Sequence, residues 1–509
     1  MPPDSTSAQQ LATAMFVKDI RADGLHFPYV YGNQQLGEFM ANESNMNKFK
    51  QILDEEWDLL ILDELFGVHS FGLALYFKRL RNTPYIIYST TAMIQTSAYS
   101  LALGRNLVAE PYLITTTPTS DQDVYSPTKF YDRLNNIYDS TADLLLVKLY
   151  AERFQMYNIA KMGLPNFTWH ELYKKNSLIF ADYIDRMKYS LTESSDVRGI
   201  GSNCAIAKPL PRDLEDFVSD PTSNGTIYIA FGSNVNWKFA PARILDAFFE
   251  AINKFDNHRV VFSYNGVPRT GVKAHVKLVK WAPQFDVLAH PKTKMFISHG
   301  GLKSFKETIC AKQPVIFMPV FAEQTYNTKL ALRMRYASVV NKFNLDAEQL
   351  SGAISKVLYN NSYKSNAEKA YSLYLDRPIE SLDQAIFDIE RVLKRPNHNV
   401  HFLRKGIDLS WLTMFYVDWI AVFIVLLFLM KDLSKAQVKK IKKVTYDYLC
   451  KSLLSRLKAP PDWHAYVIAG VGDNKCACYC PMWSDRHFGT GKKEKKMIHR
   501  RLLKAIDLG

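Results

Sequence analysis

Short apolar runs that alternate with helix-like stretches are the feature that most constrains the fold of this chain. The alternation is clearest between residues 226 and 335. It predicts strands at 226–231, 259–264, 276–279, 294–298 and 315–318. It predicts helices at 241–255, from 302 to about 311, and at 325–335. Repeated β/α units of this kind form a doubly wound parallel sheet, so we expect an α/β fold.

A similar alternation begins earlier in the chain. The elements predicted there are a buried strand at 57–62 (WDLLIL) that ends at Asp63, a helix at 72–81, a strand at 84–88 and a helical stretch at 132–163. Strand, helix and strand in this order again indicate a parallel sheet. The sequence therefore predicts two α/β regions.

The predicted boundaries follow from composition. Residues 208–225 are rich in Pro, Asp and Ser, which is typical of a linker. We expect a partial N-terminal domain at 1–207, a linker at 208–225, a C-terminal domain at 226–408, a membrane segment at 409–430 and a basic tail at 431–509.

The segment 409–430 (LSWLTMFYVDWIAVFIVLLFLM) has the composition of a membrane-spanning helix. About 20 apolar residues cross a bilayer as a helix, and the one charged residue, Asp418, lies in the first half of the segment. Lysines follow from Lys431 onward, which predicts a cytosolic tail and a body on the other side of the membrane. A buried core helix is the alternative.

Charge distribution argues against a nucleic-acid partner. The net charge is +14, but residues 431–509 hold 18 Lys and Arg against 7 Asp and Glu. The rest of the chain is nearly neutral, so no basic nucleic-acid surface is expected.

Two further features concern the compartment. A luminal body needs a signal segment, yet the first 24 residues lack a basic region followed by an apolar one, so we expect that the natural N-terminus is missing or replaced. Cys204 and Cys310 are the only cysteines before residue 450. They could pair, but isolated thiols are the expectation.

Polar residues follow several of the predicted strands. They are Ser233, Trp281, Gln284, His299 and Glu323. Ligands bind beyond the carboxyl ends of the strands in such sheets, so these residues should converge on one edge.

The segment 299–304 (HGGLKS) joins a strand to a helix and suits a phosphate group. Glycines allow close approach of the backbone, and the N-terminus of a helix offers free N–H groups. Glu307, one turn beyond Lys303, suits the two hydroxyls of a ribose. An ordinary strand-to-helix turn and a surface glutamate are the alternatives, as a core position is for Trp281.

The ordered motifs from Trp281 to Gln324 resemble the signature of the UDP-glycosyltransferases. The matching residues are Trp281, Pro283, Gln284, His290, Pro291, Ser298, His299, Gly300, Gly301, Glu307, Pro319, Phe321, Glu323 and Gln324. Upstream, residues 227–234 (IYIAFGSN) are similar to the family strand that ends in Phe-Gly-Ser. The resemblance extends from about Phe49 to Lys443 and is to the animal UDP-glucuronosyltransferase branch, in a nematode-like form.

The resemblance implies a fold and a set of contacts. The implied fold is of the GT-B type, with two facing Rossmann-like domains, the N-terminal one truncated here, and one C-terminal transmembrane helix. The resemblance implies that Trp281 and Gln284 contact the uridine and that Glu307 contacts the ribose. It implies that Ser233, His299 and Ser304 contact the diphosphate, where Gly300 and Gly301 allow close approach of the backbone. Glu323 and Gln324 are the implied contacts of the sugar. Lys303 stands where the family often has Asn, and is a plausible phosphate partner; Glu323 stands where Asp is common.

The implied reaction is an inverting transfer of glucuronic acid or glucose from a UDP-sugar, as co-substrate, to a small lipophilic acceptor. Neither a cofactor nor a metal is expected. Asp63 resembles the carboxylate that orients the catalytic histidine of the family, although capping of the next helix is the alternative. The histidine itself is not found, because neither His26 nor His69 matches its motif.

A second hypothesis is therefore a non-catalytic, membrane-anchored donor-binding partner of full-length relatives. The expected partners are the UDP-sugar, the acceptor, the membrane and other subunits in homo- or hetero-oligomers. The expected location is the endoplasmic reticulum membrane, with a luminal body and a cytosolic tail.

Overall fold

A computed structural model of the 509-residue chain describes residues 6–24, 27–65, 67, 70–91, 93–103, 108–162, 166–184, 187, 189, 194–395, 404–414, 416–432, 443–444 and 448. Of its two compact units, Met1–Leu409 contains both sheets. The predicted basic tail at 431–509 lies almost wholly outside the described residues, as do His26 and His69.

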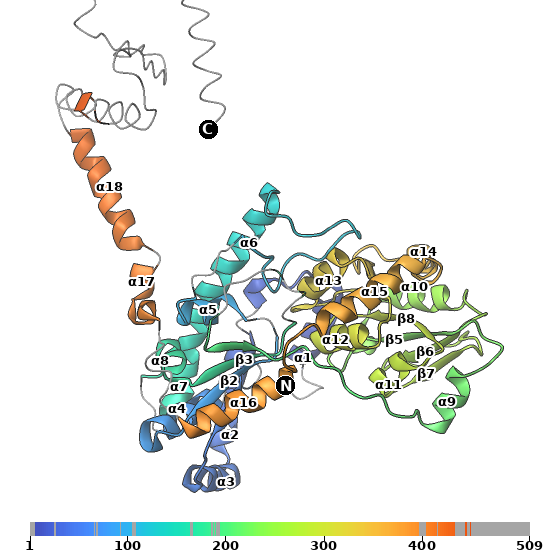
Figure 1. Cartoon of the computed structure of the whole chain (residues 1–509), viewed down its shortest axis with the longest axis horizontal. Coiled ribbons are helices and arrows are strands. Elements are labelled where there is room, and N and C mark those ends of the chain that lie inside the picture. Colours follow the sequence, from blue (N-terminus) through green and yellow to red (C-terminus); the bar gives the residue numbers. More distant parts are fainter. Residues whose placement is uncertain are drawn as a thin grey trace, which may run out of the picture. The chain divides into compact units, whose positions relative to one another are not determined.

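The first sheet is parallel, with the strand order β1-β2-β3-β4 in the described chain. Figure 1 labels its two central strands, β2 and β3. Its strands are β1 (Leu60–Asp63), β2 (Tyr85–Ser89), β3 (Leu178–Ala181) and β4 (Val197–Gly199). The first two confirm the strands predicted at 57–62 and 84–88, with shifted ends. The prediction that the first is buried is wrong, because β1 is an edge strand on which the Ile61 side chain is 56% exposed.

The second sheet is also parallel, with the order β10-β9-β8-β5-β6-β7. Its strands are β5 (Thr226–Ala230), β6 (Arg259–Ser263), β7 (Val276–Val279), β8 (Thr293–Ser298), β9 (Val315–Phe317) and β10 (Ala337–Val339). This is the doubly wound order of the Rossmann fold, in which the chain reverses direction between the two central strands, here β5 and β8. The predicted α/β class with parallel sheets is confirmed.

The helices connect the strands. In the first half they are α1 (Thr6–Val17), α2 (Phe27–Ala41), α3 (Glu43–Asp54), α4 (Ser70–Arg81), α5 (Gln95–Ser100), α6 (Phe130–Asp143), the π-helix η2 (Leu144–Ala151), α7 (Glu152–Lys161) and α8 (Trp169–Lys175). Further on they are α9 (Arg212–Val218), α10 (Ala242–Ile252), α11 (Gln284–Ala289), α12 (Leu302–Cys310), α13 (Gln324–Arg333), α14 (Ala347–Leu358), α15 (Asn361–Tyr374) and α16 (Ser381–Lys394). Short 3-10 turns lie at Ala22–Gly24 (η1), Trp237–Phe239 (η3) and Lys405–Asp408 (η5).

Three helices do not fit the predicted division of the chain into an N-terminal domain, a linker without secondary structure and a C-terminal domain. The predicted linker contains α9, whose Leu214 and Val218 are buried. Helix α1 packs on the second sheet, since Phe16 contacts Trp237 with ring centroids 5.9 Å apart. Helix α16 packs on the first sheet through Ala385. Helix α1 thus covers the second sheet and α16 covers the first, so each of these helices packs on the sheet that lies farther from it in sequence.

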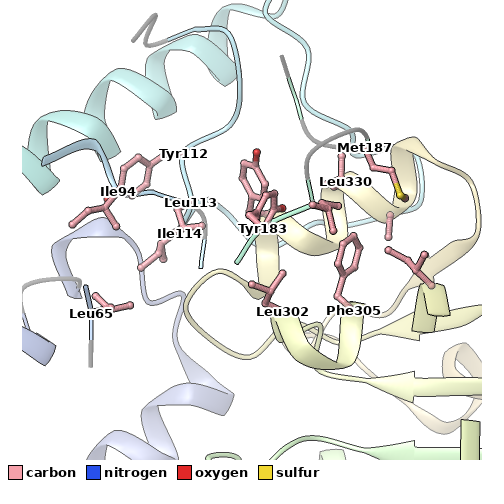
Figure 2. Packing of buried hydrophobic residues seen from close by; sticks show 14 of the residues in the cluster. Leu65, Ile94, Tyr112, Leu113, Ile114, Tyr183, Met187, Leu302, Phe305 and Leu330 are labelled. Atoms are coloured by element: carbon pink, nitrogen blue, oxygen red, sulfur yellow. The ribbon is translucent and has the colours of Figure 1, made fainter. Parts of the chain in front are cut away.

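One buried apolar cluster runs through both halves of the body (Figure 2). It joins Ile94 and Leu113 of the first half to Leu302, Phe305 and Leu330 of the second. Burial of apolar surface favours a fixed arrangement of the two sheets within this unit.

Cys204 and Cys310 form a disulfide, with Cα atoms 5.5 Å apart. The expectation of isolated thiols is wrong. The partners are 106 residues apart in sequence, and only the packing of α12 against the segment that follows β4 brings them together.

The segment predicted to span a membrane is not one continuous helix. Its described residues form α17 (Trp411–Met414) and α18 (Val417–Asp432). Side chains of α18 such as Trp419 and Phe423 are exposed. Within the part of the chain that the structure describes, no helix is both long enough and apolar enough to cross a membrane.

Candidate functional site

The centre of the candidate site lies where the two central strands of the second sheet end. Ser233 follows β5 and is exposed, and His299 follows β8 and is partly buried. The two turns are in close contact, because a Cβ atom on Gly232 would lie 3.0 Å from Cε1 of His299. The predicted convergence at the carboxyl ends of the strands is therefore found for this pair.

Glycines make room for the imidazole of His299. A Cβ atom on Gly301 would lie 2.6 Å from its Nε2, closer than real Cβ contacts allow. Gly232 and Gly300 also have positive φ angles, of 68° and 89°, which favour glycine. Burial lowers the pKa of His299 to about 4. The ring is therefore neutral near pH 7 and offers one N–H donor without adding a charge.

Three of the predicted donor-binding residues meet through hydrogen bonds. Nε2 of Gln284, the first residue of α11, donates to Oγ of Ser304 at 3.0 Å and to the carboxylate of Glu307. Burial raises the pKa of Glu307, and the Gln284 amide opposes that shift. An amide from the start of α11 and a carboxylate from α12 thus lie side by side, as binding of a ribose would require.

Trp281 lies three residues before Gln284, in the loop after β7. Its side chain is 76% exposed, so the alternative of a core tryptophan is excluded. An exposed indole near an amide and a carboxylate can stack on a planar base.

The start of α12 is occupied by a carboxylate of the protein. The backbone N–H of Leu302 donates to Oε1 of Glu323 at 3.2 Å. Burial raises the pKa of Glu323, which the N–H bonds and Lys303 oppose. Glu323 therefore lies at the end of α12 that was predicted to hold the diphosphate, and its contact with a sugar stays a prediction.

Gln324 is used by its own loop. Its Oε1 accepts hydrogen bonds from the backbone N–H groups of Val320, at 2.8 Å, and Phe321, at 3.0 Å. The side chain is buried. Its proposed contact with a sugar also stays a prediction.

Lys303 is paired with a residue that the sequence analysis did not single out. Its Nζ forms an ion pair with Asp182, which follows β3 of the first sheet. Asp182 also accepts a hydrogen bond from Nζ of Lys306 at 2.5 Å. The strand at 178–181 was not predicted; had it been, the rule that ligands bind at the carboxyl ends of strands would have indicated Asp182.

Asp63 has a structural role at the end of β1. Its Oδ1 accepts hydrogen bonds from the backbone N–H of Leu65, at 2.8 Å, and of Gly67, at 3.3 Å. These bonds stabilise the turn after β1, and neither donor belongs to α4, which begins at Ser70. Capping of the next helix and the orienting role therefore both stay predictions. Neither His26 nor His69 is among the described residues.

Together these side chains suit a nucleotide with a diphosphate. They supply an aromatic face, an amide, a carboxylate, a neutral imidazole and helix N–H groups, from the segments that follow β7 and β8 and from helices α11 and α12. Each of these groups was predicted from the sequence.

The chain matches the family described as UDP-glucoronosyl and UDP-glucosyl transferase over residues 85–451. A UDP-glucuronosyltransferase of Pleuronectes platessa is 35% identical over 221 residues, which are 43% of this chain and 46% of that protein. UDP-glucuronosyltransferase 1A9 of Homo sapiens is 32% identical over 247 residues, or 48% of this chain and 46% of that protein. The chain therefore spans less than half the length of these relatives.

Solved structures show weaker likeness. The glycotransferase of kitacinnamycin is 14% identical with a TM-score of 0.48, over 71% of this chain and 83% of that one. UDP-glucose: anthocyanidin 3-O-glucosyltransferase in complex with UDP is 14% identical with a TM-score of 0.46, over 70% of this chain and 80% of that one.

Proposed function

Since the chain belongs to the UDP-glucuronosyl and UDP-glucosyl transferase family, as the motif resemblance predicted, we propose that it binds a UDP-sugar and transfers the sugar to a small lipophilic acceptor. The observation that carries the proposal is the meeting of Gln284, Ser304 and Glu307. The exposed Trp281 lies three residues before Gln284. Side chains from two helices and one loop combine there into groups that match uridine and ribose.

The proposed donor site extends from Trp281 to Ser233. The base stacks on the indole of Trp281, and the ribose hydroxyls donate to the carboxylate of Glu307. The diphosphate lies between the turn after β5 and the start of α12, where Ser233 and the neutral His299 donate to it. Glu323 lies next to this position and would contact the sugar. No cofactor and no metal takes part in this proposal.

The proposed transfer inverts the anomeric carbon in one displacement. The acceptor oxygen attacks the anomeric carbon, and UDP leaves with the electron pair of the broken bond. Asp63 would orient the base that removes the acceptor proton. Glucuronic acid or glucose is the proposed sugar.

The alternative is a donor-binding partner that does not turn over. One observation favours it, namely that the Asp63 carboxylate caps the turn after β1. A carboxylate that satisfies backbone N–H groups at Leu65 and Gly67 is a poorer partner for a histidine.

We also infer that the body lies in an oxidising compartment, the lumen of the endoplasmic reticulum. The disulfide between Cys204 and Cys310 supports this location, because such bonds persist there and are rare in the cytosol. Maleimide labelling of the intact microsomal protein before and after reduction would test it. Labelling of both cysteines without reduction would contradict the proposed location.

The experiment that tests the function uses the full chain in microsomes, with a UDP-sugar and a panel of lipophilic phenols. Trp281→Ala should reduce UDP affinity by about 10- to 100-fold, since stacking on a base contributes about 1–3 kcal/mol. Trp57→Ala is the matched control, because Trp57 is also an exposed tryptophan but lies before β1.

The outcomes separate the hypotheses. Sugar transfer that Trp281→Ala reduces and Trp57→Ala leaves unchanged supports a working transferase. UDP binding with the same dependence but without transfer supports the non-catalytic partner. A chain that does not bind UDP would contradict both.

A further inference from the structure

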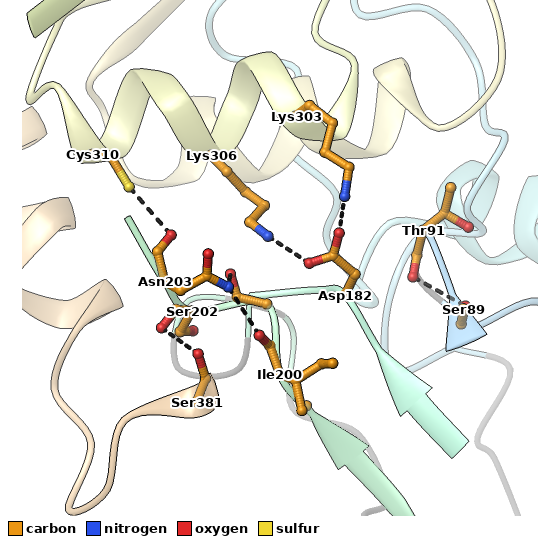
Figure 3. Close-up of polar contacts among 12 residues, drawn as sticks. Ser89, Thr91, Asp182, Ile200, Ser202, Asn203, Lys303, Lys306, Cys310 and Ser381 are labelled. Atoms are coloured by element: carbon orange, nitrogen blue, oxygen red, sulfur yellow. Dashed lines mark hydrogen bonds and ion pairs between the residues drawn. The ribbon is translucent and has the colours of Figure 1, made fainter. Parts of the chain in front are cut away.

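An ion triad joins the first sheet to the donor helix. Asp182 follows β3, and its carboxylate is almost fully buried. Lys303 and Lys306, both on α12, direct their ammonium groups at its two oxygens (Figure 3). One carboxylate therefore faces two lysines within this triad.

The two lysines differ in their exposure to solvent. Lys306 is 8% exposed, and its Nζ donates to Oδ1 of Asp182 at 2.5 Å. The side chain of Lys303 is 64% exposed and reaches the other oxygen, Oδ2, from solvent. Ion pairs of exposed side chains contribute little, because water and salt screen them, whereas a buried charge needs a fixed partner. Lys306 is thus the permanent partner of Asp182, and Lys303 is the exchangeable one.

Lys303 is the second residue of α12, in the first turn of the helix. The proposed diphosphate position lies at this turn. In the free protein, the carboxylate of Glu323 already accepts the N–H of Leu302 there. A diphosphate brings further negative charge to this place, and a mobile ammonium group would balance it.

We propose that Asp182 is a positioning residue for the donor phosphates: it holds Lys303 beside the first turn of α12, and Lys306 keeps Asp182 neutralised when Lys303 transfers to the diphosphate. This inference rests on the proposed donor site and adds to it the two residues that release the lysine. No covalent bond changes in this exchange. An ammonium–phosphate contact replaces an ammonium–carboxylate contact.

The role predicts an effect for a lysine that does not touch the donor. In Lys306→Met, Asp182 would have Lys303 as its one remaining partner among the two lysines, so Lys303 would stay on it. The Kd of UDP should rise about tenfold, the loss expected for one charge-assisted hydrogen bond. The Kd of uridine, which has no phosphate, should not change. In Lys306→Met/Asp182→Asn a neutral amide replaces the carboxylate and no longer holds Lys303, so the Kd of UDP should return to within about threefold of the wild-type value.

The test is titration calorimetry of the full chain with UDP and with uridine, for the wild type, the two variants above and Asp182→Asn alone. Lys277→Met is the matched control, because Lys277, on the edge strand β7, forms an ion pair with Asp213 of α9. It should leave both Kd values unchanged.

Several results would overturn the inference. One is an unchanged UDP affinity in Lys306→Met. Another is a parallel loss of UDP and uridine affinity, which would indicate a disturbed helix. The third is no recovery of UDP affinity in the double variant.

If Lys306→Met does not fold, Asp182→Asn is compared with Asp182→Asn/Lys303→Met. A tenfold loss for UDP alone supports the inference, and equal affinities overturn it. A wild-type chain that does not bind UDP would refute the donor site as well, whereas UDP binding that depends on Trp281 but not on Lys306 refutes this inference alone.

Discussion

Removal of the Cys204–Cys310 disulfide should lower the stability of the body while leaving the donor site formed. Cys310 is the last residue of α12, and Cys204 lies in the segment that leaves the first sheet. That segment has other contacts: the hydroxyl of Tyr374 accepts from the backbone N–H of Asn203 at 3.3 Å and donates to the carbonyl oxygen of Gly201. The hydrogen bonds of Tyr374 therefore keep this segment in place in the folded state when the disulfide is absent, whereas the conformational entropy of the unfolded chain increases.

The size of the effect follows from the loop that the disulfide closes. The two cysteines are 106 residues apart. Closing a loop of that length stabilises the folded state by about 4.8 kcal/mol at 25 °C in the chain-entropy treatment. With a urea m-value of about 3 kcal/mol/M, the midpoint of unfolding should fall by about 1.6 M.

The assay is urea unfolding followed by tryptophan fluorescence, with and without reductant, for the wild type and for Cys204→Ala/Cys310→Ala. Reductant should shift the wild type to the midpoint of the double variant and leave the double variant unchanged. UDP affinity should stay within about threefold, because Tyr374 still holds the segment. A wild-type midpoint that is insensitive to reductant, or a large loss of UDP affinity on reduction, would refute this reasoning.

Three further predictions concern single residues. Burial holds the pKa of His299 at about 4 against an ordinary 6.5, so as pH falls the unfolded chain takes up the proton first, and about 3 kcal/mol of stability should be lost between pH 6.5 and 4. Urea unfolding at each pH should show this loss in the wild type but not in His299→Gln, and parallel pH profiles of the two would refute the prediction. Nζ of Lys342 donates to the carbonyl oxygens of Met15 and Lys18 at 2.7 Å each. Lys342→Met should therefore loosen the attachment of α1 and speed the cleavage of the native protein by trypsin after Lys18 about tenfold. An unchanged cleavage rate would show that apolar packing alone holds the helix. Glu307→Gln should weaken UDP by about tenfold but 2′-deoxy-UDP much less, as calorimetry would measure; equal losses would exclude contact with the ribose hydroxyls.

Local pattern predicted the second sheet well. The strands expected at 226–231 and 259–264 are found within one residue, because a buried parallel strand needs a continuous apolar run that stands out in the sequence. The helix at 302–311 is α12, whose Leu302, Phe305 and Ile309 face the core at helical spacing.

The first sheet was predicted less completely. Strands β3 and β4, at 178–181 and 197–199, are too short to be distinguished from other apolar stretches. Because β3 was missed, Asp182 was missed with it. The burial predicted for residues 57–62 was also wrong, since the edge position of β1 depends on which strands pair.

The sequence by itself determined the class of fold, the family, and the residues that gather at the edge of the second sheet. These follow from short-range rules: the periods of strands and helices, and the meeting of parallel strands at their carboxyl ends. Only the tertiary structure decided that Cys204 pairs with Cys310, that α1 and α16 cover the sheets distant from them in sequence, and that Asp182 holds Lys303. Each of these contacts joins residues more than 100 positions apart, and their geometry depends on how whole elements pack to bury apolar surface.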